Sequence, residues 1–226
     1  EVRIIFELIN NLTILLLISN RFLLSGLMFG ITLANKTSVA IVLPFFLLFI
    51  FFNKQKYKKN IIKCISFCIL MCFAFRIFQP YAFNSLVNIS PKFISNINEA
   101  HKMITGEIDY PPNIQWKNTI PILHTLYNLF FAGVGPITFL LTIFGIHKVC
   151  KNQKLFKKTE IKFILIVSIT IFIYHSVLLA KYMRYLYPIY PILIIFAGYT
   201  ISFLNRKVFY LFFIINIIIT VSFLNI

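Results

Sequence analysis

The sequence predicts an all-α fold, a polytopic transmembrane helical bundle that forms a single transmembrane domain over residues 1–226. Three observations predict this class. The chain is 59% hydrophobic and 17% aromatic, its apolar residues form long runs, and its positive charges lie in blocks between these runs. Soluble domains average about 45–50% apolar residues. A water-soluble core could not bury this much apolar surface, so we expect a membrane protein.

The apolar runs predict about eight membrane-spanning helices, because about 17–25 apolar residues cross the hydrocarbon core. The expected spans are 3–19, 21–35, 38–52, 61–78, 119–146, 161–180, 188–204 and 208–225. The first three runs are short or closely joined. The run 119–146 is long, and Gly133, Gly135 and Pro136 predict a break in it. This run is either one tilted span or an interfacial turn followed by a span.

The lysine blocks predict the orientation of these spans. The net charge is +16, and the lysines gather at 54–63 and at 148–162. This pattern is typical of cytoplasmic loops and their lipid headgroups, so we expect a lipid bilayer as partner and no nucleic acid. The expected localisation is a multi-pass integral protein of a prokaryotic cytoplasmic membrane. The turn around Lys36 and the segments 79–118 and 181–187 then lie on the extracytoplasmic face.

The segment 79–118 is the one long polar stretch and is expected to form an extracytoplasmic loop. An amphipathic helix is predicted near 90–105, with apolar residues such as Phe93, Ile94 and Ile97 on one face. Tyr110–Pro111–Pro112 is expected to end it. A helix of this kind lies on the membrane surface.

Four cations stand at helix ends on the predicted extracytoplasmic face, where positive charge is disfavoured. They are Lys36, Arg76, Lys181 and Arg184. Together with neighbouring aromatic residues they could form a pocket for phosphate or pyrophosphate, which arginine binds with a bidentate fork and lysine as a point charge. The alternative is that these side chains simply reach the outer lipid headgroups.

Three motifs occur in order along the chain. They are GITLANKTSVAIVLP (30–44), RIFQPYAF (76–83) with YPPNIQW (110–116), and KYMRYLYPIYPIL (181–193). Their order resembles the GT-C superfamily of membrane glycosyltransferases, which includes protein mannosyltransferases and bacterial enzymes that use polyprenyl-phosphate sugars. The middle block resembles a narrower group, the "YYY" membrane proteins of bacteria and archaea. The resemblance covers most of residues 20–195.

The resemblance implies transfer of a sugar from a polyprenyl-phosphate donor to an acceptor on the extracytoplasmic face. Lys36 and Arg184 would then hold the phosphate, with Arg76 beside them. Aromatic side chains such as Trp116 would stack on the sugar, although Trp116 could instead anchor the chain at the interface. The implied substrate-binding residues are Lys36, Arg76, Gln79, Tyr81, Trp116, Arg184 and Tyr185.

The catalytic acid that the resemblance implies has no clear counterpart. GT-C enzymes carry acidic residues in their first outer loop, and some relatives hold a divalent metal ion with them. The chain begins with Glu1 rather than Met and shows no signal-peptide pattern, so we expect a fragment that lacks the N-terminal part. Glu99, Glu107 and Asp109 remain as candidate general bases. The cysteines and histidines lack metal-ligand spacing, so the residues themselves predict no metal site.

Two other classes of function stay open from the sequence. One is a non-catalytic membrane transporter or lipid-binding scaffold. Transporters often place ionisable residues at the bilayer midplane, whereas the cations here stand at helix ends. The other is a polysaccharide polymerase or ligase, which would share the topology and the outer-face arginines.

Overall fold

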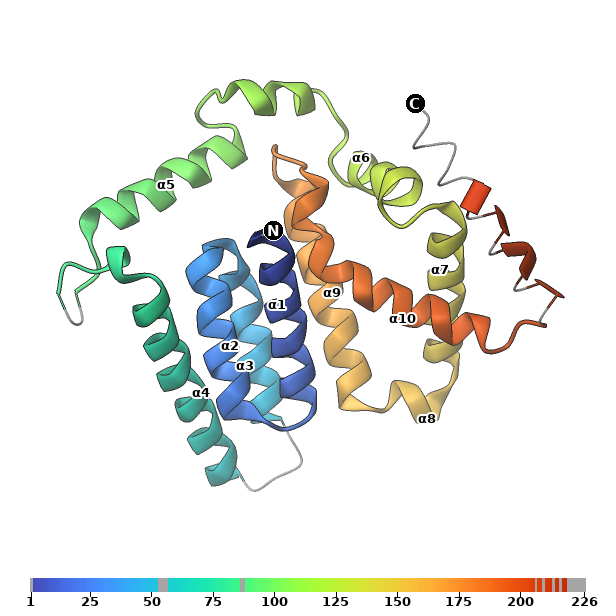
Figure 1. The fold of residues 1–226 in the computed structure, drawn as a ribbon, viewed down its shortest axis with the longest axis horizontal. Coiled ribbons are helices and arrows are strands. Elements are labelled where there is room, and N and C mark those ends of the chain that lie inside the picture. Colours follow the sequence, from blue (N-terminus) through green and yellow to red (C-terminus); the bar gives the residue numbers. More distant parts are fainter. Residues whose placement is uncertain are drawn as a thin grey trace. The chain divides into compact units, whose positions relative to one another are not determined.

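The computed structural model describes residues 2–205 apart from 53–56 and 86–87, and residues 207–218 apart from 209, 213 and 216 (Figure 1). Over these ranges the chain is helical and forms no strand, and an isolated β-bridge joins Phe83 to Ile89. The predicted all-α class is therefore confirmed. The chain packs as two compact units, Glu1–Ile114 (unit 1) and Gln115–Ile226 (unit 2). The single-domain organisation stays a prediction.

Unit 1 begins with closely packed apolar helices. They are α1 (Val2–Ile18), α2 (Phe22–Asn35), the 3-10 turn η1 (Thr37–Val42), α3 (Leu43–Phe51) and α4 (Tyr57–Phe78). The chain turns between α1 and α2 at Asn20, whose φ of 60° is a left-handed value that asparagine tolerates. α2 packs against both α1 and α4, so it forms the centre of this unit.

Two glycines set the register between α2 and α4. Gly26 lies on the backbone of Phe67, and Gly30, four residues later, lies on the backbone of Met71. A spacing of small residues such as this lets helix backbones approach closely. Because both contacts have the same sequence separation, α2 and α4 run in the same direction. Their C-terminal ends therefore lie at one end of unit 1.

The predicted amphipathic helix is present as α5 (Pro91–Thr105), after the short 3-10 turn η2 (Pro80–Ala82). The expected terminator was wrong. The helix ends at Gly106, whose left-handed φ of 90° lets the Gly106 and Glu107 amides both donate to the Lys102 carbonyl. A glycine in this position ends many helices. The Pro-rich stretch forms a separate 3-10 turn, η3 (Pro111–Trp116).

Unit 2 follows the expected runs, including the break. α6 (Pro121–Asn128) and the π-helical turn η4 (Leu129–Gly133) are bent by 114° from α7 (Pro136–Lys151). The predicted break at this position is confirmed, with Gly135 at a left-handed φ of 82° that glycine readily adopts. The remaining helical elements are α8 (Gln153–Phe156), α9 (Thr159–Val177), η5 (Met183–Tyr185), η6 (Tyr187–Ile189) and α10 (Tyr190–Ile201).

The core of unit 2 fixes α10, and with it the loop that precedes α10. Val149, Ile192 and Phe196 are buried together, and apolar side chains of α8 and α9 pack against them. Gly145 of α7 lies directly on the Phe196 carbonyl. The Thr200 hydroxyl donates to the Leu141 carbonyl at 2.7 Å. Because α10 is held against α7, the chain that enters it is held as well.

The expectation of about eight spans is wrong for the described residues. Two helices there are long and apolar enough to cross a membrane, α4 with 22 residues and α9 with 19, and a third is added if the bent pair of α6 and α7 counts as one span. The helices at the other expected spans are shorter: α1 has 17 residues, α2 has 14, α3 has 9 and α10 has 12. In the runs 38–52 and 188–204, part of the apolar sequence forms the 3-10 turns η1 and η6 instead of the helix that follows. The run 208–225 lies largely outside the described residues.

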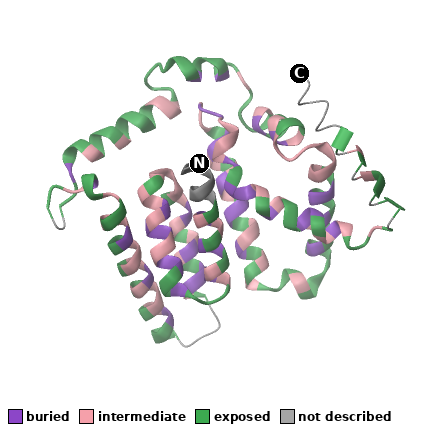
Figure 2. Cartoon of the chain, viewed as in Figure 1, coloured by how far each residue is buried: buried purple, intermediate pink, exposed green. Residues whose placement is uncertain are grey.

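The surface of α4 supports a membrane environment. Ile62, Ile65, Ile69, Phe73 and Ile77 recur along one face and are each more than half exposed. Figure 2 shows the exposed residues running the length of this helix. Such an unbroken apolar stripe suits lipid rather than water. The structure thus supports a membrane protein with a few candidate spanning helices.

Candidate functional site

The loop between α9 and α10 carries the third motif and forms the candidate site. α9 ends at Val177, and both Leu178 and Tyr182 have extended backbones. Two 3-10 turns follow, and Pro188 and Pro191 stand in the first turn of η6 and of α10. Proline favours the first turn of a helix and disfavours an interior position. The prolines therefore stop α9 and α10 from merging and leave 178–189 as a compact loop.

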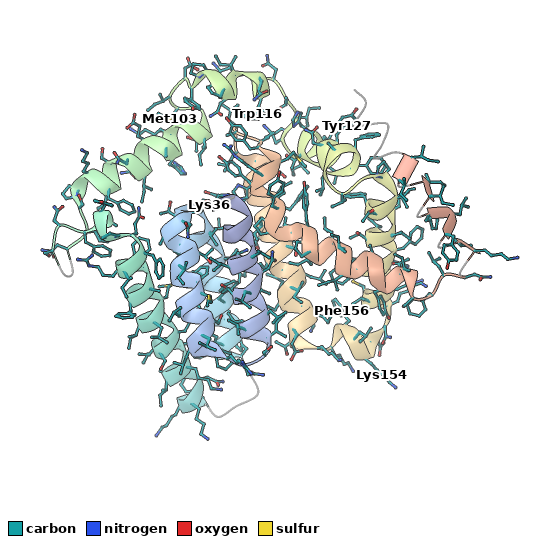
Figure 3. All side chains as sticks on the ribbon, in the orientation of Figure 1. Lys36, Met103, Trp116, Tyr127, Lys154 and Phe156 are labelled. Carbon is teal, nitrogen blue, oxygen red and sulfur yellow. The ribbon has the colours of Figure 1, made fainter. Side chains whose placement is uncertain are left out.

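Aromatic rings pack along this loop. The Trp116 ring, from η3, meets the Tyr182 ring edge to face with centroids 4.4 Å apart. Tyr182 in turn meets Tyr185 at 5.5 Å, and Tyr185 meets the ring of His175 from α9 at 5.0 Å. Trp116 is only 8% exposed and is labelled in Figure 3. We call these residues, with Lys181 and Arg184, the Arg184 cluster.

Arg184 lies across this row of rings. Its guanidinium carbon is 4.1 Å from the Tyr182 ring centroid and 5.6 Å from that of Tyr185. Rings at this distance attract the cation and hold its plane. Among the described residues, the guanidinium contacts these rings, and such contacts leave its N–H groups able to donate to an acceptor. A half-buried guanidinium held in this way is suited to a phosphate oxygen.

Lys181 is a second cation of this loop, three residues before Arg184, and is almost fully buried, at 6% exposure. Its Nζ donates to the Leu179 carbonyl at 3.4 Å, which is a long hydrogen bond. Burial lowers the pKa of the Lys181 ammonium. Lys181 also interacts electrostatically with His124 of α6. A buried cation with so little compensation is stabilised by an anion.

Beneath the loop lie polar groups from the end of α9. His175 is 8% exposed and Ser176 is fully buried. No described residue forms a hydrogen bond with the Ser176 hydroxyl, and orphaned buried polar groups of this kind are rare. The π-helical turn approaches the same loop, since a methyl group on Gly133 would lie 3.2 Å from the end of the Met183 side chain. Turns of this type are frequent at functional sites.

The other predicted cations belong to unit 1. Because α2 and α4 run in the same direction, Lys36 and Arg76 lie at the same end of this unit. Lys36 follows the last residue of α2 with an extended backbone and is half-buried. The Arg76 guanidinium lies 4.8 Å from the Phe83 ring and donates to the Ser85 carbonyl at 3.4 Å.

The remaining predicted residues of unit 1 are more open. Tyr81 is 89% exposed, and Gln79 precedes it at the start of η2. The candidate bases Glu99, Glu107 and Asp109 are all exposed. Glu107 accepts a hydrogen bond from the Thr105 hydroxyl at 3.2 Å.

The structure thus brings together Trp116, Arg184 and Tyr185 of the predicted set. A pocket shared with Lys36 and Arg76 stays a prediction, because those residues belong to unit 1. Tyr182 was missed, although it stands in the KYMRY stretch. Only the folded loop shows that its ring joins Trp116 to Arg184.

Over the described ranges, His, Cys, Asp and Glu form no group of three or more that could hold a metal ion. In comparisons with known proteins, no family model, curated protein or solved structure matches the chain. The inference of function therefore depends on the chemistry of the Arg184 cluster and on the resemblance of the motifs.

Proposed function

We propose that this chain is, or is part of, a multi-pass membrane glycosyltransferase of the GT-C type, which moves a sugar from a polyprenyl-phosphate donor to an acceptor on the extracytoplasmic face. The observation that carries the proposal is the Arg184 cluster, in which a half-buried arginine lies against a row of aromatic rings and a buried lysine stands three residues before it. A donor of this class presents a phosphate, a sugar and an apolar tail. The cluster and the exposed apolar helix faces match these three parts.

The proposed roles follow from the chemistry. Arg184 and Lys181 bind the donor phosphate, and the aromatic rings line the space beside it where the sugar lies. In the transfer, the bond from the anomeric carbon to the phosphate oxygen breaks and a bond from that carbon to an acceptor oxygen forms. The acceptor proton passes to a general base, for which Glu99, Glu107 and Asp109 are the candidates. The released polyprenyl phosphate gains negative charge, which the two cations stabilise more strongly than they stabilise the donor.

The finer topology belongs to the same proposal. The apolar helices α1, α2 and α10, although shorter than a full span, lie within the bilayer, as α4 and α9 do. Helices of this length are accommodated by local thinning of the bilayer or by packing against neighbours. Within unit 1, Lys36 and Arg76 then lie at its extracytoplasmic end.

The test is sugar transfer by the chain reconstituted in lipid nanodiscs, with a labelled polyprenyl-phosphate sugar. We expect Arg184→Ala to lower transfer by about 10–100-fold, since a hydrogen bond to a charged group contributes about 1.5–3 kcal/mol. Lys154→Ala, which removes an exposed lysine of α8, is the matched control and should retain activity. Equal activity of both variants would overturn the proposal. Uptake of substrate into vesicles without transfer would instead indicate a transporter.

A further inference from the structure

A second site lies in unit 1, where α2 begins and α4 passes beside it. A hollow of about 450 Å³ opens there, lined among others by Arg21, Leu24, Ile62, Lys63 and Ser66. The contact of Gly26 with Phe67 lies one turn further along, so the hollow is at the opposite end of α2 from Lys36. It therefore has no part in the proposed donor site.

The hollow is positively charged. Arg21 and Lys63 both line it, and none of its described lining residues is acidic. The Lys63 ammonium lies 4.6 Å from the centroid of the Phe22 ring, which also lines the hollow. That contact holds the ammonium beside the start of α2 instead of leaving it to extend into solvent.

The start of α2 adds to this charge. The helix begins at Phe22, and no side chain caps its first turn. The first amide N–H groups of a helix have no acceptor within the helix and carry the positive end of its dipole. Here they belong to residues that line the same hollow as the two cations. Together these groups suit a phosphate.

The walls of the hollow are apolar and open to the surroundings. Leu23 is 56% exposed, Leu24 47% and Ile62 62%. Ile62 begins the exposed stripe of α4 that continues through Ile65 and Ile69. A free phosphate would gain nothing from such walls, whereas a lipid would place its acyl chains against them.

We propose that this hollow binds the headgroup of an anionic membrane phospholipid. The phosphate lies between Arg21, Lys63 and the first turn of α2, and the acyl chains follow the exposed face of α4. Basic pockets between membrane helices on the cytoplasmic side bind anionic headgroups in this way. The lipid would fix α2 against α4 at the end that the positive charges place on the cytoplasmic side.

The experiment titrates purified chain in detergent with phosphatidylglycerol or phosphatidylcholine and counts bound lipid by native mass spectrometry. We expect saturable binding of phosphatidylglycerol, with at least about tenfold weaker binding for Arg21→Gln and Lys63→Gln. Lys58→Gln, which removes an exposed lysine from the same end of α4, is the matched control and should bind nearly as wild type. Equal losses in all three variants would overturn the proposal, as would equal affinity for the two lipids.

Two further measurements distinguish a lipid site from a site for free phosphate, and a loss of binding from a loss of folding. Inorganic phosphate at the same concentration should not displace the lipid, and displacement would show a simple anion site. Arg21→Lys keeps the charge and should keep most of the binding. If Arg21→Lys loses binding while its circular dichroism and thermal unfolding match the wild type, a phosphate held by charge at this position is contradicted.

Discussion

The rings of Tyr182 and Tyr185 hold the Arg184 guanidinium in position. A planar guanidinium stacks on rings and presents a fork of donors, which an ammonium does not. We therefore expect Arg184→Lys, which keeps the charge, to weaken donor binding nearly as much as Arg184→Ala. The measurement is the dissociation constant of a fluorescent polyprenyl-phosphate sugar. Full retention of affinity in Arg184→Lys would show that charge alone suffices and that the stacked geometry is irrelevant.

Because of Lys181, we expect both the stability of the chain and its affinity for anions to depend on pH. Burial lowers the pKa of Lys181 in the folded chain, whereas the pKa of a lysine in an unfolded chain is about 10.4. Between the two values the unfolded state binds more protons, so the contribution of Lys181 to the free energy of unfolding rises with pH. Anion binding falls over the same window, because the folded lysine loses its charge.

The check on Lys181 is donor affinity measured from neutral to alkaline pH. As the pH is raised, wild type should begin to lose affinity before the pH at which an ordinary lysine loses its proton. Lys181→Arg stays charged throughout this range, so its affinity should remain level. Identical pH profiles for the two proteins would show that Lys181 does not contact the anion.

At the scale of single helices, close backbone contact decides how α2 meets α4. A methyl group on Gly30 would collide with the Met71 carbonyl and lie 2.7 Å from the Ala74 side chain. Overpacking of this kind costs about 1–3 kcal/mol. We expect Gly30→Ala to lower the thermal stability of the chain in detergent.

The matched control for Gly30 is Gly198→Ala in α10. A methyl group on Gly198 meets nothing within 4 Å, and alanine in a helix interior is favoured over glycine by about 0.5–1 kcal/mol. This variant should be as stable as wild type or more so. If Gly30→Ala were equally well tolerated, the close packing of α2 on α4 would be contradicted.

The extent of each helix was largely predictable, and its role was not. Phe22–Asn35 and Pro91–Thr105 nearly match the expected 21–35 and 90–105. An apolar run marks the first helix, and an amphipathic period with a starting proline marks the second. The number of spans was overestimated, since hydropathy counts the apolar residues of a 3-10 turn such as Thr37–Val42 together with the short helix that follows it. The ring contact between Trp116 and Tyr182 was unpredictable, because it joins residues far apart in the sequence.

At the scale of the whole molecule, the charge pattern predicts which ends face which side. Cys150 is exposed beside Lys148 and Lys151, and Ser95 is exposed on α5. In sealed cells, an impermeant maleimide should label Ser95→Cys in a chain whose native cysteines are replaced by alanine. Cys150, retained as the sole cysteine, should react only after the membrane is opened. Labelling of both positions from the same side would contradict the topology.

The most direct test of the central claim compares two ligands that differ only in the phosphate. Wild type should bind a polyprenyl phosphate at least about tenfold more tightly than the corresponding polyprenol, and the double variant Lys181→Ala/Arg184→Ala should bind both equally. If wild type binds the phosphate and the alcohol with the same affinity, the Arg184 cluster is not a phosphate site and the proposed function loses its basis.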